Sequence, residues 1–581
     1  MLERIQTRWL RLGLGVAILS AAAFATPPSG RFDREAMGDI VRKVYETHSR
    51  EAASAKPTYL GSEVCIACHK DKASYRETLH AKGLKHTWDD VNSMKVKDGI
   101  IADYDRNGVD DFKQGIDFNQ INSAFNKYKP NAPVLGYRTG KGYTVTIAGV
   151  EFLVGFVHGG TGDYKQRYVL RFPVTNTATG YSADYYYSPV QFNETSKSYV
   201  LYSDNYWWNA DLTPKIKGPM TAAVAAKTGK SFNLGCVGCH STVFSVKQDV
   251  NGEWVSTTAT AIYVKDGDNH YLDLNGVGDP QLLNIGCERC HGAGLKHVMN
   301  YGNKKFIVKP EKDFTAKQQN ELCGSCHSRG TSMSGKHEYP LSLDGKDFGE
   351  EMGGDLYGKY WIDKPGLWPD GKTSRQHHQQ LQDMMKSSKW EYAYHKVTCT
   401  ECHDVHVATK KHIRTTMTVT EGGATLKIPT ATDDNTLCLA CHAGFGPFDK
   451  LKRAMIVDPK ANETLIASVV TAHTRHSFAP DGEVGLSRCT ECHMAKMAAS
   501  GDAYDMHSHT FEVVPAEKTL QYQAQGGMPN SCAVRCHRGI AQLFGQPADT
   551  SLTNWTEASD VAVANWLKTY YGKDGIWWKT K

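Results

Sequence analysis

The chain of 581 residues has little of what would anchor it in a membrane or bind it to nucleic acid. After the first 30 residues it contains no long apolar run, and a helix that spans a bilayer needs about 20 mostly apolar residues. Runs rich in Lys or Arg are absent as well, which leaves nucleic acid without support as a partner. The chain also lacks any solitary cysteine, because all 16 cysteines fall into pairs.

The N-terminal residues contain the one apolar run. Arg4, Arg8 and Arg11 precede an apolar stretch from Leu12 to Ala25, which ends in Ala-Phe-Ala. This order is typical of a secretory signal peptide, which we predict over residues 1–25. A membrane anchor is the alternative, but the run is shorter than the roughly 20 residues that a span requires. We therefore expect an exported protein, either periplasmic or extracellular.

Each of the eight cysteine pairs is followed directly by a histidine. Seven pairs have the spacing Cys-x-x-Cys-His, and the eighth, Cys532 to His537, has one additional intervening residue. Two thiols at this spacing can form thioethers to one porphyrin, and the histidine then becomes the proximal iron ligand. A zinc site has no need of a histidine after every pair, and neither has a disulfide. The pattern predicts c-type haems.

We number these motifs one to eight in chain order. The eighth is interpreted as a further haem site, because Cys532 and Cys536 are the only cysteines outside the regular motifs and they too precede a histidine. A structural disulfide is the alternative, and eight haems are expected. The predicted thioether cysteines are Cys65, Cys68, Cys236, Cys239, Cys287, Cys290, Cys323, Cys326, Cys399, Cys402, Cys438, Cys441, Cys489, Cys492, Cys532 and Cys536. The predicted proximal ligands are His69, His240, His291, His327, His403, His442, His493 and His537.

The remaining histidines are candidates for the second axial ligand of each iron. The chain has 24 histidines, so bis-histidine ligation of every haem is within its supply. Those that lie near a motif are the better candidates, and the set is His80, His297, His395, His406, His476, His509, His378 and His86. The alternatives are His473 for His476, His507 for His509 and His377 for His378, with His48 and His158 weaker.

A long haem-free stretch separates the first two motifs. Residues 141–160, 164–175 and 181–192 alternate β-branched or aromatic residues with polar ones, which predicts strands of an antiparallel sheet. A smaller β-like patch is predicted at 252–276, and an amphipathic helix at 559–572. The predicted fold is a multihaem cytochrome c, with short helices and loops packed around haems and a β-rich N-terminal insertion.

This pattern divides the chain into four predicted parts. They are the signal peptide at 1–25, an N-terminal domain at 26–225 with the first haem and the β-rich insertion, a haem-dense domain at 226–545 with seven haems, and a C-terminal helix and tail at 546–581. Much of the core of the haem-dense domain is expected to be porphyrin itself.

Several sequence segments carry a family resemblance. "LWPDG", "HKVTCTECHDVH", "LCLACH", "HTRH", "SRCTECHMAK", "HSHTFEV" and "MPNSCAVRCH" resemble the C-terminal part of bacterial multihaem cytochromes related to the cytochrome c-554 group. "GYTVTIAGVEF", "YKQRY" and "SFNLGCVGCH" are similar to the N-terminal part of these proteins. The resemblance implies an electron carrier, with distal ligands at His80, His297, His395, His406, His476 and His509. The three-residue spacing in "CAVRCH" departs from the family pattern.

One acidic loop predicts a site of another kind. Asp103, Asp105, Asn107 and Asp111 stand at positions 1, 3, 5 and 9 around a turn glycine, as at the start of an EF-hand calcium loop. Position 12 is Gln114 rather than Glu. A solvated acidic turn is the alternative, and the stretch from Asp273 to Asp279 has a weaker version of the pattern.

The expected function is multi-centre electron transfer by an octahaem cytochrome in anaerobic respiration. Its expected partners are redox proteins, namely donor and acceptor cytochromes or a quinol-linked complex. One alternative is an oxidoreductase of the hydroxylamine oxidoreductase or nitrite reductase type with one open haem, although no motif ends in the Lys that such reductases often use. A further alternative is a subunit that associates with itself in an extracellular filament, and metal oxides are also possible acceptors.

Overall fold

The computed structural model describes residues 34–48, 58–86, 101–248, 252–256, 262–273, 284–387, 396–538, 555 and 558–576, apart from isolated positions within these ranges. The predicted signal peptide and part of the predicted tail lie outside them. Within the described ranges, none of the helices combines the length and the apolar character needed to cross a membrane.

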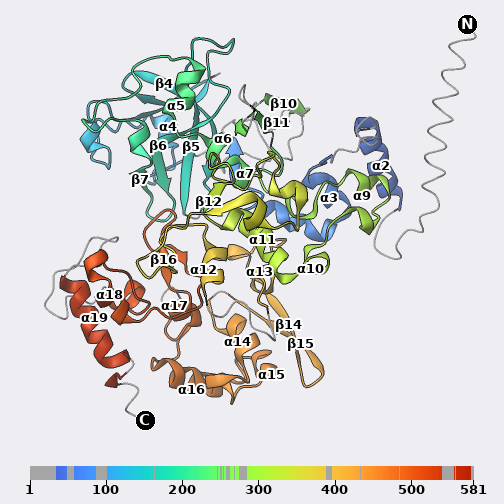
Figure 1. Cartoon of the computed structure of the whole chain (residues 1–581), viewed down its shortest axis with the longest axis vertical. Coiled ribbons are helices and arrows are strands. Elements are labelled where there is room, and N and C mark those ends of the chain that lie inside the picture. The colour runs from blue at the N-terminus through green and yellow to red at the C-terminus, as the bar shows by residue number, and fades with distance from the viewer. Residues whose placement is uncertain are drawn as a thin grey trace, which may run out of the picture.

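An antiparallel sheet of seven strands forms the N-terminal part of the structure (Figure 1). Its strands are β1 Leu84–His86, β2 Val134–Arg138, β3 Gly142–Ile147, β4 Val150–Gly159, β5 Lys165–Arg171, β6 Tyr186–Asn193 and β7 Ser198–Leu201. Strands β2 to β7 pair in chain order, and β1 pairs with β4. The β-rich insertion expected from residues 141–192 is therefore present.

The sheet has its own hydrophobic core. Phe152 on β4 is fully buried, and its ring meets the rings of Phe172 and Trp207 with both centroids 5.0 Å away. Large aromatic side chains bury much apolar area, so the side chains of this region fill its interior by themselves. At Gly155 the register of β4 shifts by a bulge, and a β-carbon there would lie 2.5 Å from the Tyr185 ring. Only glycine fits this close approach.

Short helices carry the cysteine motifs through the rest of the chain. The motif-bearing helices are α3 Ser62–Cys68, α7 Val237–His240, α8 Glu288–His291, α11 Ala316–His327, α13 Cys399–Cys402, α14 Thr436–His442, α17 Cys489–His493 and the π-helical turn η13 Ala533–His537. Cysteines at positions 1 and 4 and the histidine at position 5 fall on one side of a helical turn, so a single turn can present all three side chains to one group.

The remaining elements pack around these turns. The helices are α2 Arg34–His48, α4 Asp111–Gln114, α5 Ala222–Thr228, α6 Phe232–Gly235, α9 Leu295–Met299, α10 Pro310–Asp313, α12 Gln380–Lys386, α15 Arg453–Ile456, α16 Glu463–Thr474, α18 Ala516–Gln521 and α19 Ala558–Tyr571. The strands form two-stranded pairs: β8 Lys247–Gln248 with β9 Trp254–Ser256, β10 Ile262–Asp266 with β11 Asn269–Asp273, β12 Gly330–Ser332 with β13 Trp361–Asp363, β14 Thr416–Glu421 with β15 Ala424–Pro429, and β16 Lys496–Ala498 with β17 Met506–His507.

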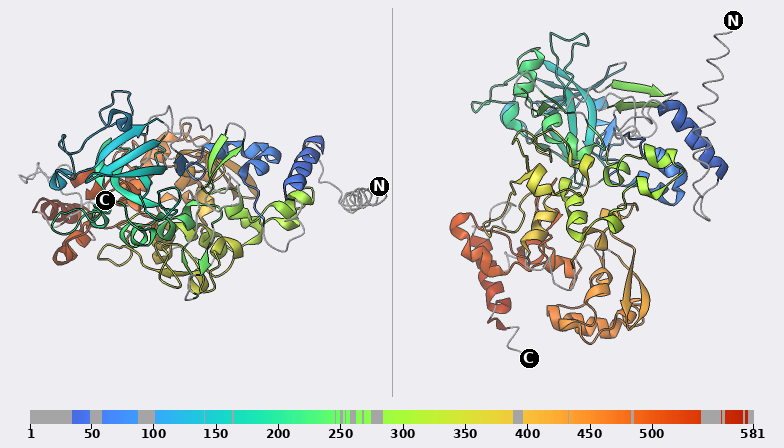
Figure 2. Two further views of the ribbon diagram at one scale, coloured as in Figure 1. Left: turned by 90° about the horizontal axis from the view of Figure 1, so that it is seen from above. Right: turned by 45° about the vertical axis from the view of Figure 1, so that its right-hand side comes forward.

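The 3-10 and remaining π-helical turns are η2 Lys70–Glu77, η4 Asn126–Tyr128, η5 Asp204–Tyr206, η7 Lys304–Phe306, η8 Phe348–Glu351, η9 Leu356–Tyr360, η10 Lys410–His412, η11 Gly446–Phe448 and η12 Gln523–Gln525. The view in Figure 1 and the right-hand view in Figure 2 both place the sheet at one end of the molecule and α14, α15 and α16 at the other. The motif-bearing helices therefore extend from beside the sheet to the opposite end.

Candidate haem sites

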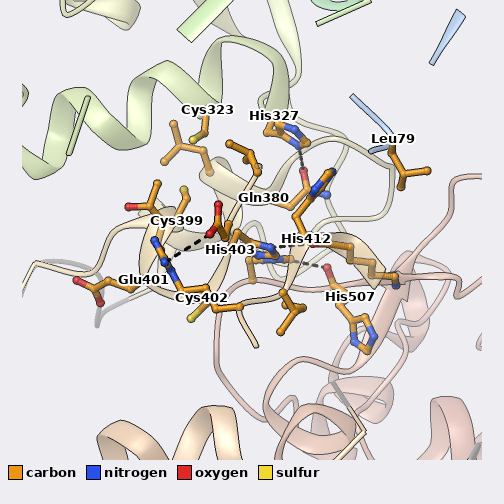
Figure 3. A pocket seen from close by; sticks show the side chains of 18 of the residues that line it. Leu79, Cys323, His327, Gln380, Cys399, Glu401, Cys402, His403, His412 and His507 are labelled. Carbon is orange, nitrogen blue, oxygen red and sulfur yellow. Dashed lines mark hydrogen bonds and ion pairs between the residues drawn. The ribbon is translucent and has the colours of Figure 1, made fainter. Parts of the chain in front are cut away.

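One continuous cavity of about 3430 Å³ runs through the motif-bearing part of the structure. A site for one drug-sized ligand measures roughly 300–1,000 Å³, so this cavity has room for several large groups. At least one cysteine of each of the eight motifs lines it. Figure 3 shows part of the wall, where Cys323 of the fourth motif and Cys399 and Cys402 of the fifth lie around one space with His327, His403 and His412.

The eighth motif reaches the same geometry as the others by a different turn. In the regular motifs the histidine N–H donates to the carbonyl of the first cysteine four residues earlier, as from His240 to Cys236 at 3.1 Å. In the eighth motif His537 N–H donates to the carbonyl of Cys532, five residues earlier, also at 3.1 Å. A π-helical turn accommodates one extra residue in this way. The additional residue of "CAVRCH" is therefore taken up by the backbone.

Cysteines of different motifs lie near one another along the cavity. Four pairs of thiols are close enough for each thiol to shift the pKa of the other: Cys65 with Cys287, Cys239 with Cys326, Cys323 with Cys399, and Cys438 with Cys489. These pairs relate the first motif to the third, the second to the fourth, the fourth to the fifth and the sixth to the seventh.

Thiol electrostatics complete the order of the motifs. Burial raises the pKa of Cys290, Cys402 and Cys492 to about 12, and thiols of the next motif add to each rise. The pKa of Cys290 is raised by thiols of the fourth motif, that of Cys402 by thiols of the sixth, and that of Cys492 by thiols of the eighth. The motifs thus follow one another as first, third, fourth, fifth, sixth, seventh and eighth, with the second beside the fourth.

Histidine rings face each other in pairs across the cavity. An iron held about 2 Å from one nitrogen of each of two imidazoles would separate the ring centroids by roughly 6 Å. The measured pairs of proximal and candidate distal ligand are His291 with His406 at 6.0 Å, His493 with His473 at 6.2 Å, His327 with His80 at 6.3 Å, His537 with His476 at 6.3 Å and His403 with His509 at 6.5 Å. These spacings fit an iron between the rings.

The sequence left His473 and His476 as alternatives, whereas the structure places each of them beside the proximal histidine of a different motif. His473 faces the seventh motif and His476 faces the eighth. His476 also stacks on Tyr571 of α19, at 5.6 Å between centroids. The "HTRH" segment therefore lies between two motifs, with a left-handed Arg475 between its histidines.

Hydrogen bonds at Nδ1 orient both proximal and distal rings. Among the proximal ligands, Nδ1 of His291 lies 2.8 Å from the Val308 carbonyl and Nδ1 of His403 lies 3.0 Å from the Lys411 carbonyl. A metal-ligating histidine generally donates its other ring N–H in this way, which fixes the tautomer. The same Nδ1 contact is made by His297, His406, His412, His476, His507 and His509, at 2.6 to 3.2 Å.

Burial keeps the imidazoles neutral. It lowers the pKa of His80 and His509 to about 3 and that of His240 to about 4, with smaller contributions from neighbouring histidines and, at His240, from Arg167 and Lys165. Only a neutral imidazole has the lone pair that binds a metal. These rings are therefore in the form that iron ligation requires.

His412 is a candidate ligand that the sequence reasoning missed. Its ring stacks on His80 with centroids 4.9 Å apart, and its Nδ1 lies 3.2 Å from the Val407 carbonyl. Its Nε2 is buried without a hydrogen-bond partner. His412 lies nine residues after His403, beyond the immediate flank of the motif, so its place was not evident from spacing. It shares the space beside His327 with His80.

The second motif has a different surrounding. The nearest ring to His240 is His158, at 4.1 Å and 68° between planes, which is closer than an iron between two imidazoles allows. Two further candidates, His377 and His378, contact each other with centroids 4.3 Å apart. Burial lowers the pKa of all three candidates. The spacing at this motif therefore differs from the five pairs above.

Cations gather beside the second motif. Lys165 and Arg167 on β5 and Arg329 all act on the ring of His377 or His378. The Lys165 ammonium donates to the Ser500 carbonyl at 2.8 Å, and the Arg167 guanidinium lies 3.5 Å from the centroid of Tyr202. A haem carries two carboxylates, so these cations can hold them.

Buried polar contacts of Arg289 and Glu288 link the third motif to the second motif and to the segment before the first. The Arg289 guanidinium of the third motif pairs with both oxygens of Asp347, and it also donates to the Gly238 carbonyl of the second motif at 3.0 Å. The neighbouring Glu288 carboxylate accepts from the backbone N–H of Leu60 at 2.9 Å, just before the first motif.

The structure also places several other predicted residues. His297 lies on α9, where it contributes to the lowered pKa of His69 of the first motif. Asp103, Asp105 and Asp111 lie together. His395 and most of the stretch from Asp273 to Asp279 lie outside the described residues, as do the side chains of His48 and His86. His442 and Cys441 are exposed at the surface.

The donor set fits c-type haem. Paired thiols with an adjacent histidine line a cavity that is too large for the side chains to fill, and facing imidazoles have the separation that an iron needs. When bound, haem would supply one-electron redox chemistry, and the chain's own residues would set its axial ligands and its exposure.

Comparison with known proteins finds similarity in structure only. No family model and no curated protein matches the sequence. The outer cell wall cytochrome OcwA is similar with a TM-score of 0.44 and 19% identity, over 88% of this chain and 86% of that one. An undecahaem cytochrome from the S-layer of Carboxydothermus ferrireducens is similar with a TM-score of 0.33 and 15% identity, over 91% of this chain and 65% of that one. Both of these proteins are described as cytochromes.

Proposed function

We propose that this chain is an exported octahaem c-type cytochrome that conducts electrons through a row of eight haems. The observation that carries the proposal is the single cavity of about 3430 Å³ that cysteines of all eight motifs line. Since thiols of neighbouring motifs lie close enough to shift one another's pKa, haems attached there would lie side by side. Adjacent haems exchange electrons without a mobile carrier.

The axial ligands favour conduction over substrate chemistry. Five proximal histidines face a second histidine at a spacing that suits an iron between them. Bis-histidine ligation leaves no open iron position, and it gives lower reduction potentials than ligation by methionine and histidine. A row of such haems suits transfer at low potential, as in anaerobic respiration.

The exposed motifs are where electrons would enter and leave. Cys441 and His442 of the sixth motif are exposed, and so is Cys536 of the eighth. A haem edge at the surface can approach a partner, either a donor or acceptor cytochrome or a quinol-linked complex. We place this exchange in the periplasm or outside the cell, where a metal oxide or a second copy of the chain in a filament could also serve as acceptor.

A second candidate function rests on the second motif. His158 lies too close to His240 to share an iron with it in this geometry, and Arg167 and Arg329 place positive charge beside the site, while burial lowers the pKa of the neighbouring Lys165. A haem with a vacant face beside these cations would attract a small anion such as nitrite. On this basis the protein would be an oxidoreductase of the nitrite or hydroxylamine type, supplied with electrons by the other seven haems.

Electron paramagnetic resonance of the oxidised holoprotein distinguishes the two functions. The electron-transfer proposal predicts only low-spin ferric signals, and almost no spectral change when carbon monoxide is added to the reduced protein at neutral pH. The second candidate predicts a high-spin signal and a carbon monoxide shift for about one haem in eight, because a five-coordinate iron has a weak ligand field and a free position. High-spin signals from several haems would contradict both.

A further inference from the structure

A cluster of three carboxylates lies on the sheet side of the molecule, away from the cysteine motifs. The carboxylates of Asp103, Asp105 and Asp111 offer oxygen atoms that all lie within 4.8 Å of one another. Asp103 and Asp105 belong to a loop, and Asp111 is the first residue of α4. Three carboxylates this close repel one another unless a cation lies between them.

Hydrogen bonds within the loop hold its backbone in a tight turn. Asp103 accepts from the backbone N–H groups of Asn107 and Gly108, both at 2.9 Å, and the amide oxygen of Asn107 accepts from Val109 at 2.8 Å. Gly108 has φ of 80°, a left-handed turn that glycine adopts without strain. This is the sharp turn that calcium loops place after their first three ligand positions.

Asp111 supplies the independent observation that points to a cation. Its side chain is fully buried, with an exposed fraction of 0%. One carboxylate oxygen accepts from the Tyr104 backbone N–H at 3.0 Å and from the Tyr199 hydroxyl at 2.6 Å. The other oxygen, Oδ1, is buried without a hydrogen-bond partner. A buried, unpartnered carboxylate oxygen is costly, and a bound cation removes that cost.

We propose that Asp103, Asp105 and Asp111 bind one calcium ion. The donors are all oxygens, which excludes a preference for zinc or copper. Calcium accepts six to eight oxygen ligands in flexible geometry, so backbone carbonyls, water and the Asn107 amide can complete its shell, whereas magnesium demands a stricter octahedron. Because position 12 is Gln114 instead of a bidentate Glu, the site binds calcium more weakly than a complete EF-hand.

The ion would brace the strand that faces the second haem motif. The loop begins at Ile101, whose carbonyl accepts from the Gln166 amide on β5 at 2.6 Å. Successive side chains of a strand point to opposite faces, so Lys165 and Arg167, on either side of Gln166, face the haem cavity. Asp111 in turn binds Tyr199 on β7. Calcium therefore ties the loop to two strands, one of which carries the cations beside His240.

The test uses the holoprotein freed of calcium with a chelator. Isothermal titration with calcium chloride is expected to show one site per chain, and magnesium chloride at the same concentration is expected to give little heat. In scanning calorimetry the sheet region is expected to melt about 5 °C lower in chelator than in saturating calcium. Absence of both the heat and the shift would overturn the proposal.

Two variants separate this site from calcium bound elsewhere, for example by haem carboxylates. Asp105→Asn changes an exposed ligand and should fold normally, while abolishing the heat and the shift. Asp111→Asn should do the same, and it serves as a second ligand variant if it folds. Asp449→Asn, an exposed carboxylate after η11, is the matched control and should bind calcium as the wild type does. Undiminished calcium binding in Asp105→Asn would overturn the proposal.

Discussion

The sheet region and the haem-dense region fill their interiors in different ways. Between Ile101 and Ala225 most buried apolar side chains form one large cluster, and the others, such as Phe156 and Tyr185, pack with Val237 of the second motif. After residue 284 the apolar side chains form several separate clusters, such as the one of Phe348, Leu356, Tyr360 and Trp361, and they surround a cavity of about 3430 Å³. The difference teaches that the first region is stabilised by its own side chains, and the second by the haems it would bind.

The strongest way to break this comparison is to remove the haems. Full-length chain produced without haem attachment is expected to keep the sheet and lose the haem-dense region, because empty apolar cavities of this size are unstable. Limited proteolysis followed by mass spectrometry should yield a resistant fragment within residues 101–232 and rapid cleavage across 284–538. Protection of the haem-dense region in the apoprotein would refute the comparison.

The sheet region can be tested by truncating its core. Phe152→Ala removes a fully buried ring between Phe172 and Trp207, and it is expected to lower the free energy of unfolding of this region by about 3–5 kcal/mol. The haem content should not change. Val224→Ala is the control, because Val224 on α5 is 48% exposed and does not line the cavity, and its loss should cost less than about 0.5 kcal/mol. Calorimetry of both holoproteins makes the comparison.

The polar contacts between motifs sharpen the comparison on the haem-dense side. Asp347→Asn leaves the buried Arg289 guanidinium without its charged partner. This change is expected to lower the free energy of unfolding by about 3 kcal/mol and to weaken the packing of the second motif against the third. Denaturant unfolding followed at the haem absorption band measures this. Glu311→Gln, which affects the exposed pair with Arg414, should cost less than about 1 kcal/mol; equal effects would contradict the assigned role of Arg289.

The smallest expected change is confined to one iron. His406→Ala removes the ring that faces His291 at 6.0 Å, so the haem of the third motif should become high-spin and bind carbon monoxide while the fold stays intact. His337→Gln is the control, since His337 is buried outside the cavity, and its paramagnetic resonance spectrum should match the wild type. A wholly low-spin His406→Ala protein would mean that another residue binds that iron.

Periodicity predicted the regular parts of the fold well. Residues 164–175 contain β5, residues 181–192 contain β6 except for its last residue Asn193, and the expected helix at 559–572 is α19, from Ala558 to Tyr571. Alternation and amphipathic spacing express burial directly, so sequence suffices there. The hairpin of β14 and β15 was not predicted, and its strands are largely exposed, so they lack the pattern that burial imposes.

The pairing of candidate ligand rings was predictable only where they adjoin a motif. The rings of His406 and His509 lie near those of His291 and His403, as spacing suggested, whereas the positions of His412, His473 and His476 depend on how distant motifs pack. The π-helical turn at the eighth motif was equally hidden, because its residues differ from a regular motif by one insertion and only the backbone shows how it is absorbed.

The most direct test of the central claim is the haem content of one chain. Intact-mass spectrometry combined with a pyridine haemochrome assay on purified, folded protein is expected to give eight covalent haems, and a Cys532→Ala/Cys536→Ala variant is expected to give seven. Eight haems in the wild type and seven in the variant would place a haem at the π-helical turn. Seven or fewer haems in the wild type would contradict the proposal of eight haems in one continuous row.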